Sequence, residues 1–81
     1  MEHSIALMAI VVENPESVAR LNQLLHDYSA YILGRMGIPC QERGLNLISV
    51  ALNAPGDVIS ALSGKLGQLP DVTAKVIYAK K

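Results

Sequence analysis

The sequence offers few side chains that could carry out chemistry, and the first to consider are one cysteine and two histidines. A nucleophilic cysteine needs a nearby histidine or a helix N-terminus to form its thiolate. Cys40 ends a predicted strand beside Pro39, whereas His26 closes a predicted helix and His3 lies in the first few residues. We therefore interpret Cys40 as a small apolar filler and His26 as a partner of its helix dipole. A single cysteine supplies neither a disulfide nor the ligands of an iron–sulfur cluster, and we expect no metal and no cofactor.

The stretch SGKLG, residues 63–67, resembles part of a phosphate-binding loop. Such a loop needs the pattern G-x-x-x-x-G-K-[ST] ahead of a helix, so that backbone N–H groups curl around the anion. Counted from Gly64 and Lys65, Ile59 stands in place of the first glycine and Leu66 in place of the hydroxyl residue. We predict a helix end instead, with Lys65 complementing the helix dipole and Gly67 in the left-handed position after the last turn.

Arg35 interrupts an apolar stretch between Gly34 and Gly37. One interpretation is a snorkelling arginine that protects the edge of a sheet. The other is a guanidinium aimed at the carboxylate or phosphate of an effector, with Gly37 letting the ligand approach the backbone. Both interpretations stay open on the sequence alone.

The elements that must position these residues follow from the spacing of apolar and turn-forming residues. We predict strands at residues 5–12, 31–40, 45–53 and 72–79, and helices at residues 14–29 and 54–67. The first and third strands are apolar on both faces, and the second is broken by glycine and proline as an edge strand would be. Asn14, Pro15 and Glu16 provide the cap and first turn of the first helix. The order is βαββαβ in one domain, residues 1–81.

This order predicts an α+β, ferredoxin-like split sandwich, an antiparallel sheet in the order 4-1-3-2 with both helices on one face. The two most apolar strands then lie in the centre, and the glycine-broken and lysine-bearing strands protect the edges. Two helices cover only one face, so the apolar residues of the other face would stay in water. Because monomers rarely expose such a patch, we predict a homodimer or tetramer formed through the open sheet face.

The charge balance narrows the range of partners. Seven basic and seven acidic residues cancel, whereas domains that bind nucleic acid carry a basic excess. Beyond the Lys80-Lys81 tail no such excess is visible, and we expect no direct contact with nucleic acid. The sequence has no signal-peptide pattern and no apolar run long enough to span a bilayer. We therefore expect no membrane association and a cytoplasmic location.

Four separate stretches carry a resemblance to a known family. They are Val11-Val12-Glu13, Leu24-Leu25-His26, residues 32–39 with Arg35 and Gly37, and ALSGKLGQ at residues 61–68. In this order they resemble the iron-only hydrogenase system regulators, small stand-alone ACT-like proteins whose fold is similar to the C-terminal domain of the nickel-responsive repressor. The resemblance implies a regulatory domain that oligomerises and binds a small-molecule effector.

The resemblance also suggests where an effector would bind. In ACT-like domains the effector commonly sits at a subunit interface near the turn from the first strand to the first helix. That position implies Glu13 and Asn14, next to Pro15, as effector-binding candidates beside Arg35 and Gly37. The repressor holds its metal through an H-x-H pair, a further histidine and a cysteine, and since this sequence has no H-x-H pair, the metal site is not implied.

Together these observations predict a non-enzymatic regulatory protein that senses a small-molecule effector. By resemblance, its role is linked to the maturation or expression of iron-only hydrogenase. The alternative is an assembly module that binds a protein partner and no small ligand. A third class, the small dimeric α+β enzymes of the muconolactone-isomerase kind, is less favoured because the acidic residues sit at helix starts and turns and no two of them converge.

Overall fold

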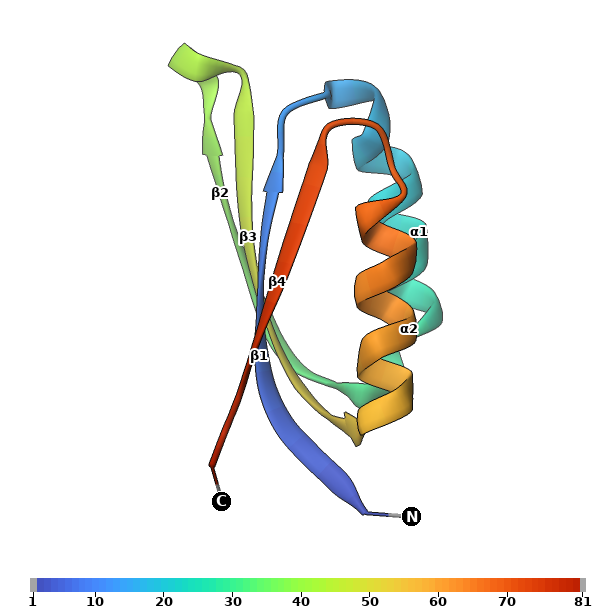
Figure 1. Cartoon of the computed structure of the whole chain (residues 1–81). Coiled ribbons are helices and arrows are strands. Elements are labelled where there is room, and N and C mark those ends of the chain that lie inside the picture. The colour runs from blue at the N-terminus through green and yellow to red at the C-terminus, as the bar shows by residue number, and fades with distance from the viewer. Residues whose placement is uncertain (1, 81) are drawn as a thin grey trace.

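In the computed structural model, which describes residues 2–80, a four-stranded sheet carries two helices on one side (Figure 1). The strands are β1 (His3–Val12), β2 (Ile32–Cys40), β3 (Leu45–Pro55) and β4 (Val72–Tyr78), and the helices are α1 (Val18–Asp27) and α2 (Gly56–Gly67). Met1 and Lys81, the latter part of the predicted basic tail, lie outside the described residues. The predicted α+β, ferredoxin-like fold with the order βαββαβ is confirmed.

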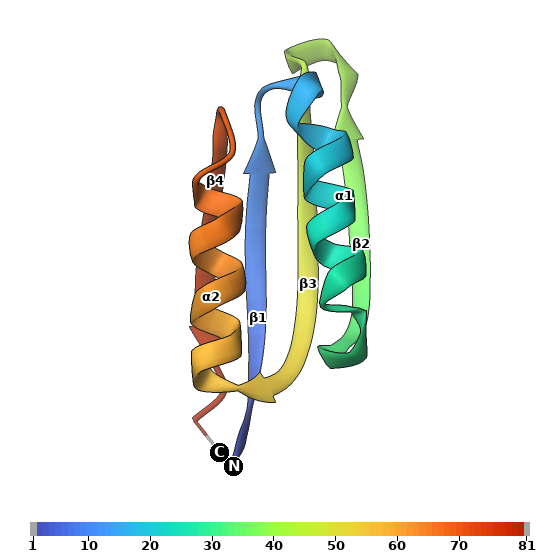
Figure 2. The same cartoon turned by 90° about the vertical axis from the view of Figure 1, so that its right-hand side faces the viewer.

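The strands lie in the spatial order β2-β3-β1-β4, and every neighbouring pair is antiparallel. This is the predicted order 4-1-3-2 read from the opposite edge. Met8 on β1 shows the register: it lies opposite Val50 on β3 and Val76 on β4. Figure 2 shows α1 lying over β3 and β2, and α2 over β4 and β1. The glycine-broken β2 and the lysine-bearing β4 are therefore the edges, as expected.

The core forms between the sheet and the helices because side chains alternate along a strand. Its buried members are Ala6, Met8, Ile10 and Val12 of β1; Val50, Leu52 and Ala54 of β3; Val72 of β4; Leu21, Leu24 and Leu25 of α1; and Ile59, Leu62 and Leu66 of α2. On each helix these residues recur three or four positions apart, which makes one apolar stripe that faces the sheet. Among residues 2–80, no helix combines the length and hydrophobicity that a bilayer crossing requires.

The cap predicted at Asn14 forms, but it caps a short 3₁₀ turn ahead of α1, and the helix itself begins only at Val18, after Ser17, whose side chain makes no cap hydrogen bond. The side-chain Oδ1 of Asn14 accepts a hydrogen bond from the backbone N–H of Glu16 at 2.9 Å. Pro15–Ser17 form a short 3₁₀ turn that leads into the helix, and its proline needs no N–H partner there. The hydroxyl of Ser17 is buried and donates to the carbonyl of Pro70 at 2.7 Å. This bond joins the start of α1 to the turn before β4.

The prediction of a left-handed Gly67 is wrong. Gly67 is the last residue of α2, and among the glycines of the described chain only Gly44 has a positive φ, of 66°. The helix closes instead by short-range bonds, in which the N–H groups of Gln68 and Leu69 donate to carbonyls three residues back. The left-handed residue that reverses the chain after α2 is Asp71, with φ 58°.

Lys65 lies in the last turn of α2, as predicted. Its Nζ stands 5.2 Å from the centre of the Tyr28 ring, just after α1. A cation over an aromatic face is attracted by the ring quadrupole. Besides its place at the C-terminal end of the helix dipole, this lysine therefore links the ends of the two helices.

Candidate functional site

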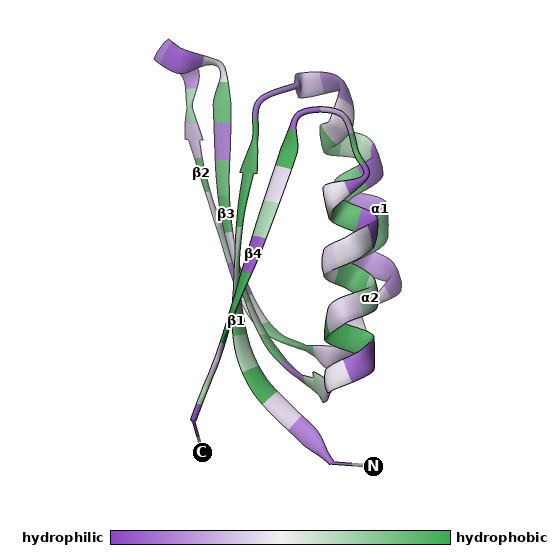
Figure 3. Ribbon diagram, in the orientation of Figure 1, coloured by the Kyte–Doolittle hydropathy of each residue, from purple (hydrophilic) through white to green (hydrophobic). Residues whose placement is uncertain are grey.

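The sheet has a second face that neither helix covers (Figure 1). The alternation that buries one set of residues on β1 points the other set outward. The same alternation holds on the other strands. The large apolar residues on the uncovered face of the described chain are each at least 40% exposed: Ile5 and Leu7 of β1, Met36 and Ile38 of β2, Leu47 of β3 and Ile77 of β4. We call this surface the open sheet face. Figure 3 shows that hydrophobic residues recur along the strands of the sheet, with the residues of both of its faces coloured alike.

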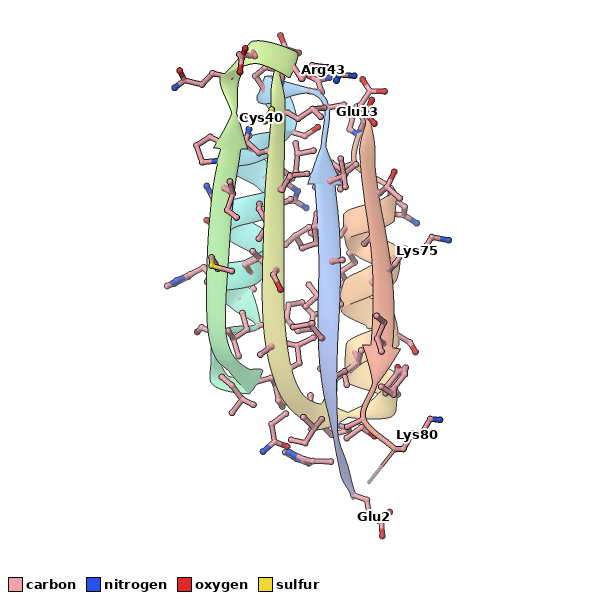
Figure 4. The ribbon with its side chains drawn as sticks, turned by 90° about the vertical axis from the view of Figure 1, so that its left-hand side faces the viewer. Glu2, Glu13, Cys40, Arg43, Lys75 and Lys80 are labelled. Atoms are coloured by element: carbon pink, nitrogen blue, oxygen red, sulfur yellow. The ribbon has the colours of Figure 1, made fainter. Side chains whose placement is uncertain are left out.

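Charged side chains lie around the open sheet face and leave its centre free (Figure 4). Glu13 and Arg43 lie at one end of the sheet and Glu2 and Lys80 at the other. Among the strand residues that the structure describes, Lys75 is the lysine that alternation places on this side of the sheet, and it lies on the edge strand β4. The sequence predicted an apolar uncovered face, and this part of the prediction is confirmed.

Arg35 lies on the other side of the sheet. It pairs with Val50, a buried residue of the helix-covered face, so its side chain extends toward α1. There its Nη2 donates a hydrogen bond to the side-chain Oδ1 of Asn22 at 3.0 Å. Both residues are exposed. The guanidinium thus reaches across from the edge strand to the helix, and its partner is a neutral amide.

Two hollows flank this contact, and we call them together the α1–β2 groove. The larger has a volume of about 510 Å³ and is lined by Asn22, Leu25, His26, Ser29, Ile32 and Arg35. The smaller, about 250 Å³, continues along β2 past Gly37 and Pro39 to Asn46 and Ile48 of β3. Space lies open over Gly37, where an added Cβ would meet no atom within 4 Å. Arg35 borders both hollows, so the structure brings the predicted pair Arg35 and Gly37 into one groove.

Glu13 and Asn14 lie elsewhere, at the turn between β1 and α1. The side chain of Asn14 serves as the cap described above, and the backbone N–H of Glu13 donates to the carbonyl of Asp71 at 2.8 Å. Neither residue lines the α1–β2 groove. Their role in effector binding remains a prediction that depends on the resemblance alone.

Cys40, His3 and His26 lie in three different parts of the fold. Cys40 is a free, half-buried thiol opposite Leu45 at the end of β2. The Nδ1 of His3 lies 3.1 Å from the side-chain Oδ1 of Asn53, and His26 lines the α1–β2 groove. Within residues 2–80, no three His, Cys, Asp or Glu side chains come together as metal ligands would.

Sequence reasoning missed the helix side of the groove. Asn22, His26 and Ser29 are spaced four and three residues apart, which puts them on one face of α1 and its end. The sequence predicts a role for His26 at the helix dipole and none for Asn22 or Ser29. The spacing alone shows that the three share a face of the helix, but it does not show that this face borders β2.

The comparisons with known proteins agree with this fold. A family model matches residues 4–76: TM1266-like, "Iron-only hydrogenase system regulator, putative". The chain belongs to this family. It is similar to the solved structure of the uncharacterized protein TM1266 from Thermotoga maritima, with 38% identity and a TM-score of 0.94 over 98% of this chain and 100% of that one. No curated protein matches.

Two more distant structures share the fold alone. The C-terminal domain of the MgtC protein from Mycobacterium tuberculosis has a TM-score of 0.74 at 10% identity, over 96% of this chain and 89% of that one. A formyltetrahydrofolate deformylase from Pseudomonas putida has a TM-score of 0.69 at 10% identity, over 95% of this chain and 29% of that one. At such identities the shared topology says nothing of a shared site.

Proposed function

We propose that this member of the family is a non-enzymatic regulatory domain of the cytoplasm that self-associates through its open sheet face and senses a small-molecule effector. The family's description links the proposal to the iron-only hydrogenase system. The observation that carries the proposal is the open sheet face itself, an apolar surface over all four strands.

The size of the open sheet face supports a second copy as its partner. Neighbouring strands lie about 4.8 Å apart, and each strand rises about 3.3 Å per residue. A sheet of four strands with about nine residues each therefore has a face of roughly 19 by 30 Å. Two copies packed face to face would bury on the order of 1,200 Å², which is above the roughly 1,000 Å² minimum for a biological interface and at the lower end of the usual range. The apolar centre and charged margin match the anatomy of such interfaces.

Sedimentation velocity at micromolar concentration tests the assembly. The monomer has a mass of 8.7 kDa, and we expect a dimer or a tetramer. A protein that sediments as a monomer would contradict the homo-oligomer and favour the alternative, an assembly module whose open sheet face binds a different protein.

A thermal-shift screen tests effector sensing. A ligand at a hundred times its dissociation constant stabilises a protein by about 2.7 kcal/mol, which moves the melting temperature of a small domain by several degrees. We expect at least one class of metabolite to raise the melting temperature. An oligomer that no metabolite stabilises would favour assembly without an effector.

A further inference from the structure

We propose that the α1–β2 groove binds a small organic carboxylate, with the guanidinium of Arg35 as its anchor. The inference depends on the proposed effector role and names the chemical class and the place of the effector.

The electrostatics of the groove favour an anion. Among the residues that line the larger hollow, Arg35 is the one with a permanent positive charge. The residues that line the smaller hollow include no Asp or Glu. Asp27, the acid that follows His26, is engaged elsewhere: its Oδ1 accepts a hydrogen bond from the side-chain amide of Gln23 at 2.9 Å. It lines a different hollow, between α1 and α2. A carboxylate entering the groove therefore meets a cation and no competing acid.

Arg35 has donors to spare. One nitrogen donates to the side chain of Asn22, while the planar fork of a guanidinium can present paired N–H groups to a carboxylate. Asn22 also fixes the guanidinium at the mouth of the groove before a ligand arrives. Less side-chain freedom is then lost on binding.

The remaining lining supplies a polar wall and an apolar floor. Ser29 and His26 line the larger hollow and can form hydrogen bonds with a bound anion, and the amide of Asn22 lies beside the guanidinium. Leu25 is fully buried beneath them and Ile32 is half-buried. A floor of this kind suits a ligand with a short hydrocarbon part. The volume of about 510 Å³ falls in the range of sites for small molecules, roughly 300–1,000 Å³.

The groove and the open sheet face are on opposite sides of the sheet. Arg35 pairs with the buried Val50, whereas its neighbours Gly34 and Met36 pair with Ala51 and Ser49 on the open side. Substitution of the Arg35 side chain should therefore remove the anion site and leave the assembly intact.

Titration of the ¹⁵N-labelled protein with sodium butyrate, followed by amide NMR shifts at constant ionic strength, tests the proposal. Saturable shifts are expected at Asn22, His26, Ser29 and Arg35, with sodium chloride giving none. Arg35→Gln should weaken butyrate binding at least about tenfold, since the charged bidentate contact is lost. The matched control is Arg43→Gln, which removes an exposed arginine from the turn after β2 and should leave binding unchanged.

A second variant covers the case in which Arg35→Gln fails to fold. Asn22→Asp places a carboxylate where Arg35 already donates, so it should keep the fold and abolish butyrate binding by occupying the anchor. Linear shifts without saturation, or equal affinity in wild type and Arg35→Gln, would overturn the proposal. Tighter binding of inorganic phosphate than of butyrate would overturn the assignment to an organic carboxylate.

Sedimentation of the same samples separates this inference from the proposed function. An oligomer that does not bind butyrate would refute the groove and leave the assembly in place. If the wild type is a monomer that binds butyrate and Arg35→Gln does not bind it, the proposed assembly is refuted and the carboxylate site in the groove is supported.

Discussion

Arg35 on β2 and Asn22 on α1 form a hydrogen bond of 3.0 Å across the gap between the edge strand and the helix. The bond lies above an apolar floor and at the junction of two hollows. It gives Arg35 a structural role, since it ties the edge strand to α1. That role is compatible with binding, because one amide occupies only part of the guanidinium.

The strength of this tie should depend on the charge at position 22. Asn22→Ala should change the free energy of unfolding by less than about 0.5 kcal/mol, because the loss of one exposed hydrogen bond is offset by the higher helix propensity of alanine within α1. Asn22→Asp should instead leave it unchanged or raise it by up to about 1 kcal/mol, since it creates an exposed ion pair with Arg35. Urea unfolding of both variants measures the difference. An aspartate variant clearly less stable than the wild type, whose asparagine has a similar helix propensity, would contradict this geometry.

Two glycines should respond in opposite ways to alanine. Gly44 has φ 66°, whereas Gly67 closes α2 without a positive φ, and neither would bring a Cβ within 4 Å of another atom. Backbone strain is therefore the difference between them. Gly44→Ala should cost about 1–2 kcal/mol, while Gly67→Ala should be neutral or stabilise by up to about 1 kcal/mol. Equal melting temperatures for the two variants would refute the assignment of the turns.

The buried hydroxyl of Ser17 should matter more than its size suggests. It donates to the carbonyl of Pro70, and Ser17→Ala would leave that carbonyl without this partner. A loss of about 1–3 kcal/mol in the free energy of unfolding is expected. Ser60 is exposed on α2, so Ser60→Ala is the matched control and should change stability little. A comparable loss in the two variants, measured by urea unfolding, would argue against the bond.

The fold could be predicted because its determinants are local and repeated. The cap at Asn14, the apolar runs of β1 and β3, and the glycines and proline of β2 each indicate one element, and together they allow few topologies. The end of α2 was not predictable in this way. A glycine just after an apolar stripe fits a left-handed cap, but the competing bonds of Gln68 and Leu69 to carbonyls of the last turn depend on the path into β4.

The candidate site was predictable on one side only. Arg35 stands out in the sequence because a charge interrupts an apolar strand. Asn22, His26 and Ser29 do not stand out, because polar residues are ordinary on the outer side of a helix. Their common place in the groove is seen only when α1 lies beside β2, a contact between segments that the sequence does not pair.

Substitution of Leu7 tests whether the open sheet face joins copies of this chain. Leu7 lies on the central strand β1, opposite Ala51 of β3 and Ile77 of β4, and is 47% exposed. Leu7→Glu would place a charge in the middle of the proposed interface, where desolvation without a partner is costly. The matched control is Ala61→Glu, an exposed position on α2.

Sedimentation equilibrium of the wild type and these two variants is the most direct measurement. We expect a dimer or tetramer for the wild type and for Ala61→Glu. For Leu7→Glu we expect a folded monomer with the 8.7 kDa mass of the chain. A monomeric wild type, or a Leu7→Glu variant that assembles as tightly as the wild type, would refute self-association through the open sheet face.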